Sequence, residues 1–90
     1  MIISHVASFY SIPERDILGQ KRDADTMQAR HTAIYLVREM THMSLQDIGD
    51  FFGRDHSTIR SSLAKTEDML ETNPNFKTTI TNLSKSIREG

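Results

Sequence analysis

Apolar residues recur every three or four positions along almost the whole chain, which is the spacing of one face of an α-helix. Residues with β-branched side chains never settle into the sustained alternation that predicts a strand. Only two prolines and four glycines interrupt the pattern, and no segment is repeated or of low complexity. We therefore predict an all-α protein.

The first part of the chain predicts two helices followed by a loop. The apolar face of the first helix consists of Ile2, Ile3, Val6, Ala7 and Tyr10. Phe9 is expected close to its packed side, and the helix should end near Ser11, where the approaching proline disfavours further helix. Pro13 suits the first turn of a short second helix that Gly19 closes. Residues 20–25 are polar and lack an apolar period, so they predict a loop.

A third helix is predicted from about Thr26 to Met40. Its side chains available for burial are Met27, Ile34, Leu36 and Val37. Arg30 and Arg38 are about two turns apart, and we expect both on one side of the helix.

Residues 44–63 read S-L-Q-D-I-G-D-F-F-G-R-D-H-S-T-I-R-S-S-L, which predicts two amphipathic helices joined at Gly53. Ser44 is a candidate N-cap, with Asp47 three residues later as in a capping box. Gly49 removes a side chain where a second helix has to approach closely. One apolar face is formed by Leu45, Ile48 and Phe52. This arrangement is typical of a helix-turn-helix, in a motif region of about 44–71.

The second helix of this motif is predicted to be long, reaching about Glu71. Its apolar positions step by four, three and four residues: Ile59, Leu63, Thr66 and Leu70. Asn73, Pro74 and Asn75 break the helix. A final amphipathic helix carries Phe76, Ile80, Leu83 and Ile87 and should pack back onto the others, which gives six helices in all.

A helix-turn-helix places the N-terminal end of its second helix in the major groove of DNA, which points to residues 54–58 as DNA contacts. Asp55 is suited to accept a hydrogen bond from a cytosine amino group, but aspartate is also a preferred N-cap. His56 suits a thymine methyl group or a phosphate. Ser57 and Thr58 suit phosphate and thymine contacts or simple solvation of the first helical turn. The residues alone leave these alternatives open.

The charge balance restricts where DNA is expected to bind. The chain carries 11 basic and 12 acidic residues, a net charge of −1, so any DNA-binding surface must be local. Lys21 and Arg22 lie in the predicted loop, where a long cation either reaches the minor groove or stays solvated. The remaining candidates for a basic face are Arg30, Arg38, Arg54, Arg60 and Lys65. Asp23 and Asp25 should weaken the field of the loop.

Length and composition exclude several classes of protein. Ninety residues fit a single domain over 1–90, without a second, cofactor-binding half. No apolar run is long enough to span a bilayer, and no secretory signal is visible. The absence of cysteine favours a reducing cytoplasm, and the four histidines lack metal-binding spacing. Without a phosphate-binding loop or an assembled nucleophile, we expect neither a metal, nor a cofactor in this chain, nor an enzyme.

The segment R-D-H-S-T-I, preceded by I-Y-L-V-R-E-M-T-H-M-S-L-Q-D-I-G-D-F-F-G, resembles the C-terminal DNA-binding domain of the bacterial replication initiator family DnaA. The resemblance covers nearly the whole chain. It implies a six-helix bundle with a Trp-repressor-like helix-turn-helix and double-stranded DNA as the partner. The recognised site would be the nine-base-pair DnaA box of the replication origin, with a loop arginine in the minor groove. ATP or ADP is expected only in the AAA+ domain of a longer parent protein.

The resemblance also implies site residues. Base contacts fall on Arg22, Asp55, His56 and Ser57, with Thr58 beside them. The expected phosphate contacts are Lys21, Arg30, His31, Arg38, Leu45, Gln46, Arg54 and Arg60. Of these, Leu45 and Gln46 would act through the backbone N–H groups of a helix N-terminus. Family members often have glutamine, lysine and threonine where His31, Arg38 and Ser57 stand, and some carry further arginines in the loop. A weaker phosphate contribution is therefore expected here.

Other functions stay open at this level. A stand-alone DnaA-like transcriptional regulator would keep the DNA-binding part alone, and a protein-interaction module would use the amphipathic final helix. The absence of a heptad seam predicts a monomer for the isolated domain. Because a helix begins within two residues of Met1, we expect an excised fragment of a longer protein, located in the bacterial cytoplasm and associated with the nucleoid.

Overall fold

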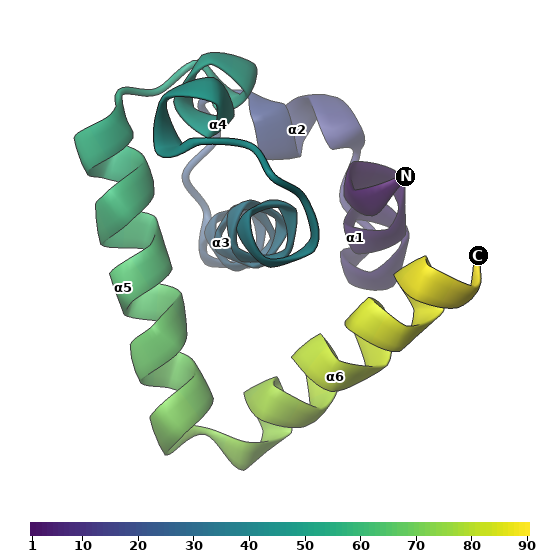
Figure 1. Ribbon diagram of the computed structural model, residues 1–90. Helices are drawn as coiled ribbons and strands as arrows, with labels where there is room; N and C mark the ends of the chain where they lie inside the picture. Colours follow the sequence, from purple (N-terminus) through teal and green to yellow (C-terminus); the bar gives the residue numbers. More distant parts are fainter.

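A computed structural model describes residues 1–90 and contains six α-helices and no strands (Figure 1). The helices are α1 (Ile2–Tyr10), α2 (Glu14–Leu18), α3 (Ala24–Met40), α4 (Leu45–Phe52), α5 (His56–Thr72) and α6 (Pro74–Glu89). The prediction of an all-α bundle that contains a helix-turn-helix is confirmed.

Helix α3 lies at the centre of the bundle, and Figure 1 shows the other helices arranged around it. It is the main source of core side chains, with Ala29, Ala33, Ile34, Leu36 and Val37 buried. Val6, Ile17, Ile48 and Ile59, from α1, α2, α4 and α5, are each fully buried against this core. Since both helices of the helix-turn-helix share the core with α3, the motif is held at a fixed orientation in the bundle.

Helix α6 returns from the end of α5 to α1, as predicted from its apolar spacing (Figure 1). Its residues Phe76, Ile80 and Leu83 are buried, while Ile87 is partly buried at the edge of the core. Asn73 ends α5 and caps α6, because its side-chain oxygen accepts a hydrogen bond from Phe76 N at 3.1 Å. Pro74 then occupies the first turn of α6, where a proline costs no hydrogen bond.

Two predicted boundaries and one predicted burial were wrong. Helix α3 begins at Ala24, because Asp23 is its N-cap and accepts a hydrogen bond from Thr26 N at 3.1 Å, so the loop is 20–23. Pro13 precedes the first turn of α2 as its N-cap residue. Phe9 is 52% exposed, since it lies beyond the edge of the face of α1 that carries Val6 and Ala7.

The expectation that Arg30 and Arg38 lie on one side of α3 was also wrong. Eight residues exceed two helical turns by roughly 80° of rotation, which is enough to separate the two side chains. Arg38 is exposed and donates to Met43 O at 3.1 Å. Arg30 is only 3% exposed, and its Nε and Nη2 donate to Ile17 O and Asp16 O, each at 2.7 Å. Arg30 therefore fixes α2 against α3 and presents no free cation to DNA.

The turn between α4 and α5 depends on two glycines. Gly53 adopts the left-handed conformation, with φ of 68°, which glycine adopts without a steric penalty. Gly49 accepts a hydrogen bond from Arg54 N at 2.8 Å. A Cβ at Gly49 would lie 2.4 Å from Arg54 O, so it is the backbone of the turn, and not the second helix, that approaches this glycine.

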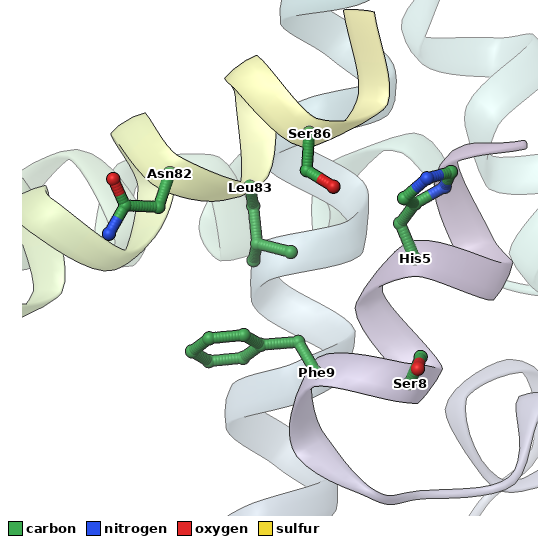
Figure 2. Close-up of a pocket in the computed structure, with 6 residues that line it drawn as sticks. All are labelled: His5, Ser8, Phe9, Asn82, Leu83 and Ser86. Carbon is green, nitrogen blue, oxygen red and sulfur yellow. The ribbon is translucent and has the colours of Figure 1, made fainter. Parts of the chain in front are cut away.

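A pocket lies between α1 and α6. Figure 2 shows its lining by His5, Ser8 and Phe9 from α1 and by Asn82, Leu83 and Ser86 from α6. None of the predicted DNA contacts lines it. No helix has both the length and the apolar character needed to cross a membrane.

We predict that Gly49→Ala destabilises the protein by about 1–3 kcal/mol, because the added methyl group forces the Arg54 backbone away from α4. Urea denaturation measures the free energy of unfolding. Asp50→Ala, which changes an exposed neighbour in the same helix, should stay within about 0.5 kcal/mol of wild type. Equal stability of the two variants would contradict the close approach at Gly49.

Candidate nucleic-acid interface

The first turn of α5 presents a row of polar side chains to solvent. His56, Ser57 and Thr58 are exposed, whereas Ile59 directly after them is fully buried and fixes the orientation of the helix. Arg60 and Lys65 are also exposed and belong to no ion pair. This end of α5 therefore offers hydroxyl, imidazole and guanidinium groups for binding.

Asp55 is the N-cap of α5. Its Oδ1 accepts hydrogen bonds from Thr58 N and from Ser57 Oγ, both at 2.9 Å. The hydrogen bonds from Thr58 and Ser57 hold the pKa of the Asp55 carboxyl below its usual value, so the group is a carboxylate at neutral pH. The other oxygen, Oδ2, accepts no hydrogen bond within the protein. Capping thus leaves one charged acceptor pointing into solvent.

Only one of the two cations in the loop 20–23 forms ion pairs with carboxylates. Lys21 Nζ lies 3.8 Å from a carboxylate oxygen of Asp16 and 3.9 Å from one of Asp23. Arg22 is exposed and forms no ion pair, and neither does Asp25. The acidic residues therefore weaken the positive field of Lys21, and Arg22 is the cation of the loop without an ion pair.

Arg54 joins this loop region to the turn of the helix-turn-helix. Its Nη1 donates to Phe52 O at the end of α4, and its Nη2 donates to Gly19 O at the end of α2, each at 2.6 Å. Both terminal nitrogens are thus engaged within the protein, which differs from the expected phosphate contact. For Gly19, only the role of ending a helix was predicted.

Arginines gather around the end of α2. Burial lowers the pKa of Arg54, and the charge of Arg22 lowers it further. Burial likewise lowers the pKa of Arg30, with additional repulsion from Arg54 and Arg22. None of the three forms an ion pair with a carboxylate, and carbonyl oxygens accept hydrogen bonds from the buried Arg30 and the half-buried Arg54. The result is a concentration of positive charge in a chain whose net charge is −1.

His31 lies half-buried between α3 and α5, where its Nδ1 forms a short hydrogen bond with Ser62 Oγ. Burial is the main cause that lowers its pKa, followed by the charges of Lys65, Arg30 and Arg54. Ser62 is buried, although the predicted buried face of this helix, with Ile59, Leu63 and Thr66, did not include it. Positions 59, 62 and 66 also follow the three-and-four spacing of one helix face, and this spacing could have indicated that Ser62 is buried.

The N-terminus of α4 forms a further part of the surface. Ser44 Oγ accepts a hydrogen bond from Asp47 N at 3.1 Å, as predicted for an N-cap. The N–H groups of Leu45 and Gln46 have no partner within the protein, and the Gln46 side chain donates to Asp50 at 3.2 Å. The exposed Arg38 reaches Met43 O, next to this helix end. Free N–H groups at a helix N-terminus favour an anion.

Comparisons with known proteins identify the family. The family model described as bacterial dnaA protein helix-turn-helix matches residues 1–65. The chain belongs to the bacterial DnaA helix-turn-helix family. Since this family model describes a helix-turn-helix domain, the match supports the expectation of a domain that is not an enzyme.

Relatives and a solved structure agree with the family. The chain is 44% identical over 87 residues to the chromosomal replication initiator protein DnaA of Aliarcobacter butzleri, covering 96% of this chain and 20% of that protein. It is 41% identical over 85 residues to the DnaA protein of Oenococcus oeni, covering 93% and 19%. A crystal structure of a DNA replication initiation factor superposes with a TM-score of 0.83 at 35% identity, covering 94% of this chain and 26% of the other. The chain spans about a fifth of the length of the curated relatives it matches.

We predict that acid destabilises this DnaA-family domain partly through His31. Its pKa in the folded protein lies below the value of 6.5 expected in the unfolded chain, so the unfolded chain binds the proton more readily. The contribution is fully present above pH 6.5 and is lost as the pH falls through the folded pKa. Urea denaturation of wild type and His31→Gln at several pH values measures it: the variant should show a smaller pH dependence. An equal pH dependence, or the same reduction in the exposed control His56→Gln, would contradict this.

Proposed function

We propose that this chain is a sequence-specific, double-stranded DNA-binding domain that recognises a DnaA box in replication initiation. We further propose that it acts as a monomer when isolated, in the nucleoid-associated fraction of the bacterial cytoplasm. Membership of the DnaA helix-turn-helix family supports the DNA partner. The observation that carries the specific proposal is the hydrogen bond from Arg54 to Gly19, which links the exposed start of α5 to the Arg22 loop.

In this proposal, α5 enters the major groove with its first turn. The open Oδ2 of Asp55 accepts from an exocyclic amino group such as that of cytosine, and His56 packs against a thymine methyl group or donates a hydrogen bond. Ser57 and Thr58 contribute hydroxyl and methyl contacts at the groove wall. Arg22 extends from the loop toward the adjacent minor groove, where A·T-rich sequence attracts arginine.

Phosphate contacts would hold the domain in register on the duplex. The candidates with accessible donors are the backbone N–H groups of Leu45 and Gln46, together with Arg38, Arg60, His31 and Lys21. Such contacts fix orientation without reading sequence. Arg30 and Arg54 belong to the internal support of the site, because their guanidinium groups already donate to carbonyl oxygens.

We predict that His56→Ala reduces the preference for a nine-base-pair DnaA box over a scrambled duplex by roughly 1–3 kcal/mol, the range for a good base contact. Arg22→Ala should lower the affinity for the box by a comparable amount. Fluorescence anisotropy with labelled duplexes at near-physiological salt measures both. Lys85→Ala, an exposed cation on α6, serves as the control and should leave the binding unchanged.

Unchanged ratios of box to scrambled binding in His56→Ala would contradict its assignment as a base-contacting residue. No binding of either duplex at micromolar wild-type protein would instead favour the protein-interaction module. A stand-alone regulator and an initiator are distinguished by the intact reading frame, since an upstream, in-frame phosphate-binding-loop domain indicates an initiator.

We predict a second effect, on salt dependence, from the ion pairs of Lys21. Asp23→Asn keeps an N-cap for α3 but removes one of the two carboxylates beside Lys21. The slope of log affinity against log salt should become steeper by up to about 0.9, the value for one additional phosphate contact. The control Asp25→Asn changes the net charge equally but frees no cation. Equal slopes for the two variants would show that the local ion pair has no influence.

A further inference from the structure

We propose that Arg54 is a positioning residue, which holds the Arg22 loop at a fixed place relative to the base-contacting end of α5 and does not itself contact phosphate. This inference rests on the proposed function. It assigns Arg54 an indirect part in specificity, through its hydrogen bond to Gly19 and through its sequence neighbour Asp55.

The backbone of Arg54 is fixed to the helix-turn-helix. Its N–H donates to Gly49 O at 2.8 Å, and its carbonyl oxygen lies where a Cβ on Gly49 would be only 2.4 Å away. The next residue is Asp55, the N-cap of α5. Any displacement of Arg54 is therefore transmitted directly to the start of the helix that carries His56.

The side chain of Arg54 is fixed to the other part of the surface. Its two terminal nitrogens bridge Phe52 O and Gly19 O, each at 2.6 Å. The contact with Gly19 is the one hydrogen bond between residues 13–23 and the helix-turn-helix. Arg22 follows only three residues after Gly19, so this bond ties the start of its loop to the helix-turn-helix.

The loop is also held at both of its ends to α3. Asp23 caps α3, while Arg30 from the same helix holds Asp16 O and Ile17 O. These contacts fix α2 against α3 and do not involve the turn of the helix-turn-helix. Beyond the shared apolar core, Arg54 makes the one hydrogen bond that connects this loop region to the turn of the helix-turn-helix. Its planar guanidinium is suited to bridge two carbonyl oxygens in a way that a lysine ammonium is not.

A double-mutant cycle in anisotropy titrations tests this inference. The proteins are wild type, Arg54→Gln, Arg22→Ala and the double variant, each titrated with the box duplex at several salt concentrations. Positioning through the loop predicts that Arg54→Gln weakens binding in the wild-type background but adds less than about a twofold loss when Arg22 is already absent. A direct phosphate contact predicts the full loss in both backgrounds, with the salt slope reduced by about 0.9 each time.

Arg54→Lys separates charge from geometry. If Arg54 acts by position, the lysine variant binds as weakly as Arg54→Gln, because one ammonium cannot hold Phe52 O and Gly19 O in the same arrangement. If Arg54 contacts phosphate, the retained charge restores most of the affinity, and that result would overturn the inference. Lys85→Ala is the control for a change of one surface charge.

Amide hydrogen exchange of the free protein provides a readout without DNA. It can also be used if the variant is less stable than wild type. In Arg54→Lys the amides of residues 19–23 should exchange faster relative to those of α3 residues near Ala33, which serve as an internal reference for global unfolding. Unchanged relative exchange would overturn the inference. Failure of the wild-type protein to prefer the box would instead overturn the proposed function, which the His56→Ala titration reports separately.

Discussion

The arrangement of the whole interface depends on how the backbone carbonyl groups at the end of α2 are satisfied. This helix has only five residues, so the carbonyl oxygens of its last turn have few donors within the helix. Two guanidinium groups supply donors from elsewhere: Arg30 from α3 and Arg54 from the turn before α5. Burying guanidinium groups without carboxylates costs free energy, and the hydrogen bonds to carbonyl oxygens offset that cost. Three segments distant in sequence meet at this point.

The same interaction explains how positive charge is concentrated near one loop of a protein whose net charge is −1. Arg30 and Arg54 form no ion pair with a carboxylate, and the charge of the exposed Arg22 is close enough to lower the pKa of both. The two ion pairs of the molecule both involve Lys21, so neither engages Arg22. Electrostatic attraction of a polyanion is a local property at physiological salt, because charges beyond a Debye length of about 8 Å are screened. The distribution of charge therefore matters more than its sum.

The sequence was sufficient to predict what depends on local periodicity. The apolar spacing predicted five of the six helices, and Pro13 and Gly19 predicted the short α2 between them. Capping residues such as Ser44 and the break at Asn73–Asn75 placed several helix ends. The start of α3 was missed although Asp23 is a typical N-cap, because the polar run 20–25 was interpreted as one loop. The direction of the Arg54 side chain was beyond prediction from spacing, since its partner Gly19 is 35 residues away in the sequence. Likewise, the partner of His31 is Ser62, a contact that exists only after α3 and α5 pack.

Under the proposed function, the Asp55 side chain serves both the stability of α5 and the recognition of DNA. A serine N-cap would also satisfy Thr58 N, but it would offer no second oxygen and no negative charge. An asparagine would present an amide nitrogen, a donor, in place of a second acceptor. Aspartate satisfies the helix through Oδ1 and keeps Oδ2 as a charged acceptor, while the hydrogen bonds from Thr58 and Ser57 keep the group ionised and fix its orientation. The cap therefore orients the free oxygen before any ligand binds, which reduces the entropy lost on forming a contact. Because Arg54 precedes this cap and reaches Gly19, that orientation is defined relative to the loop as well as to α5.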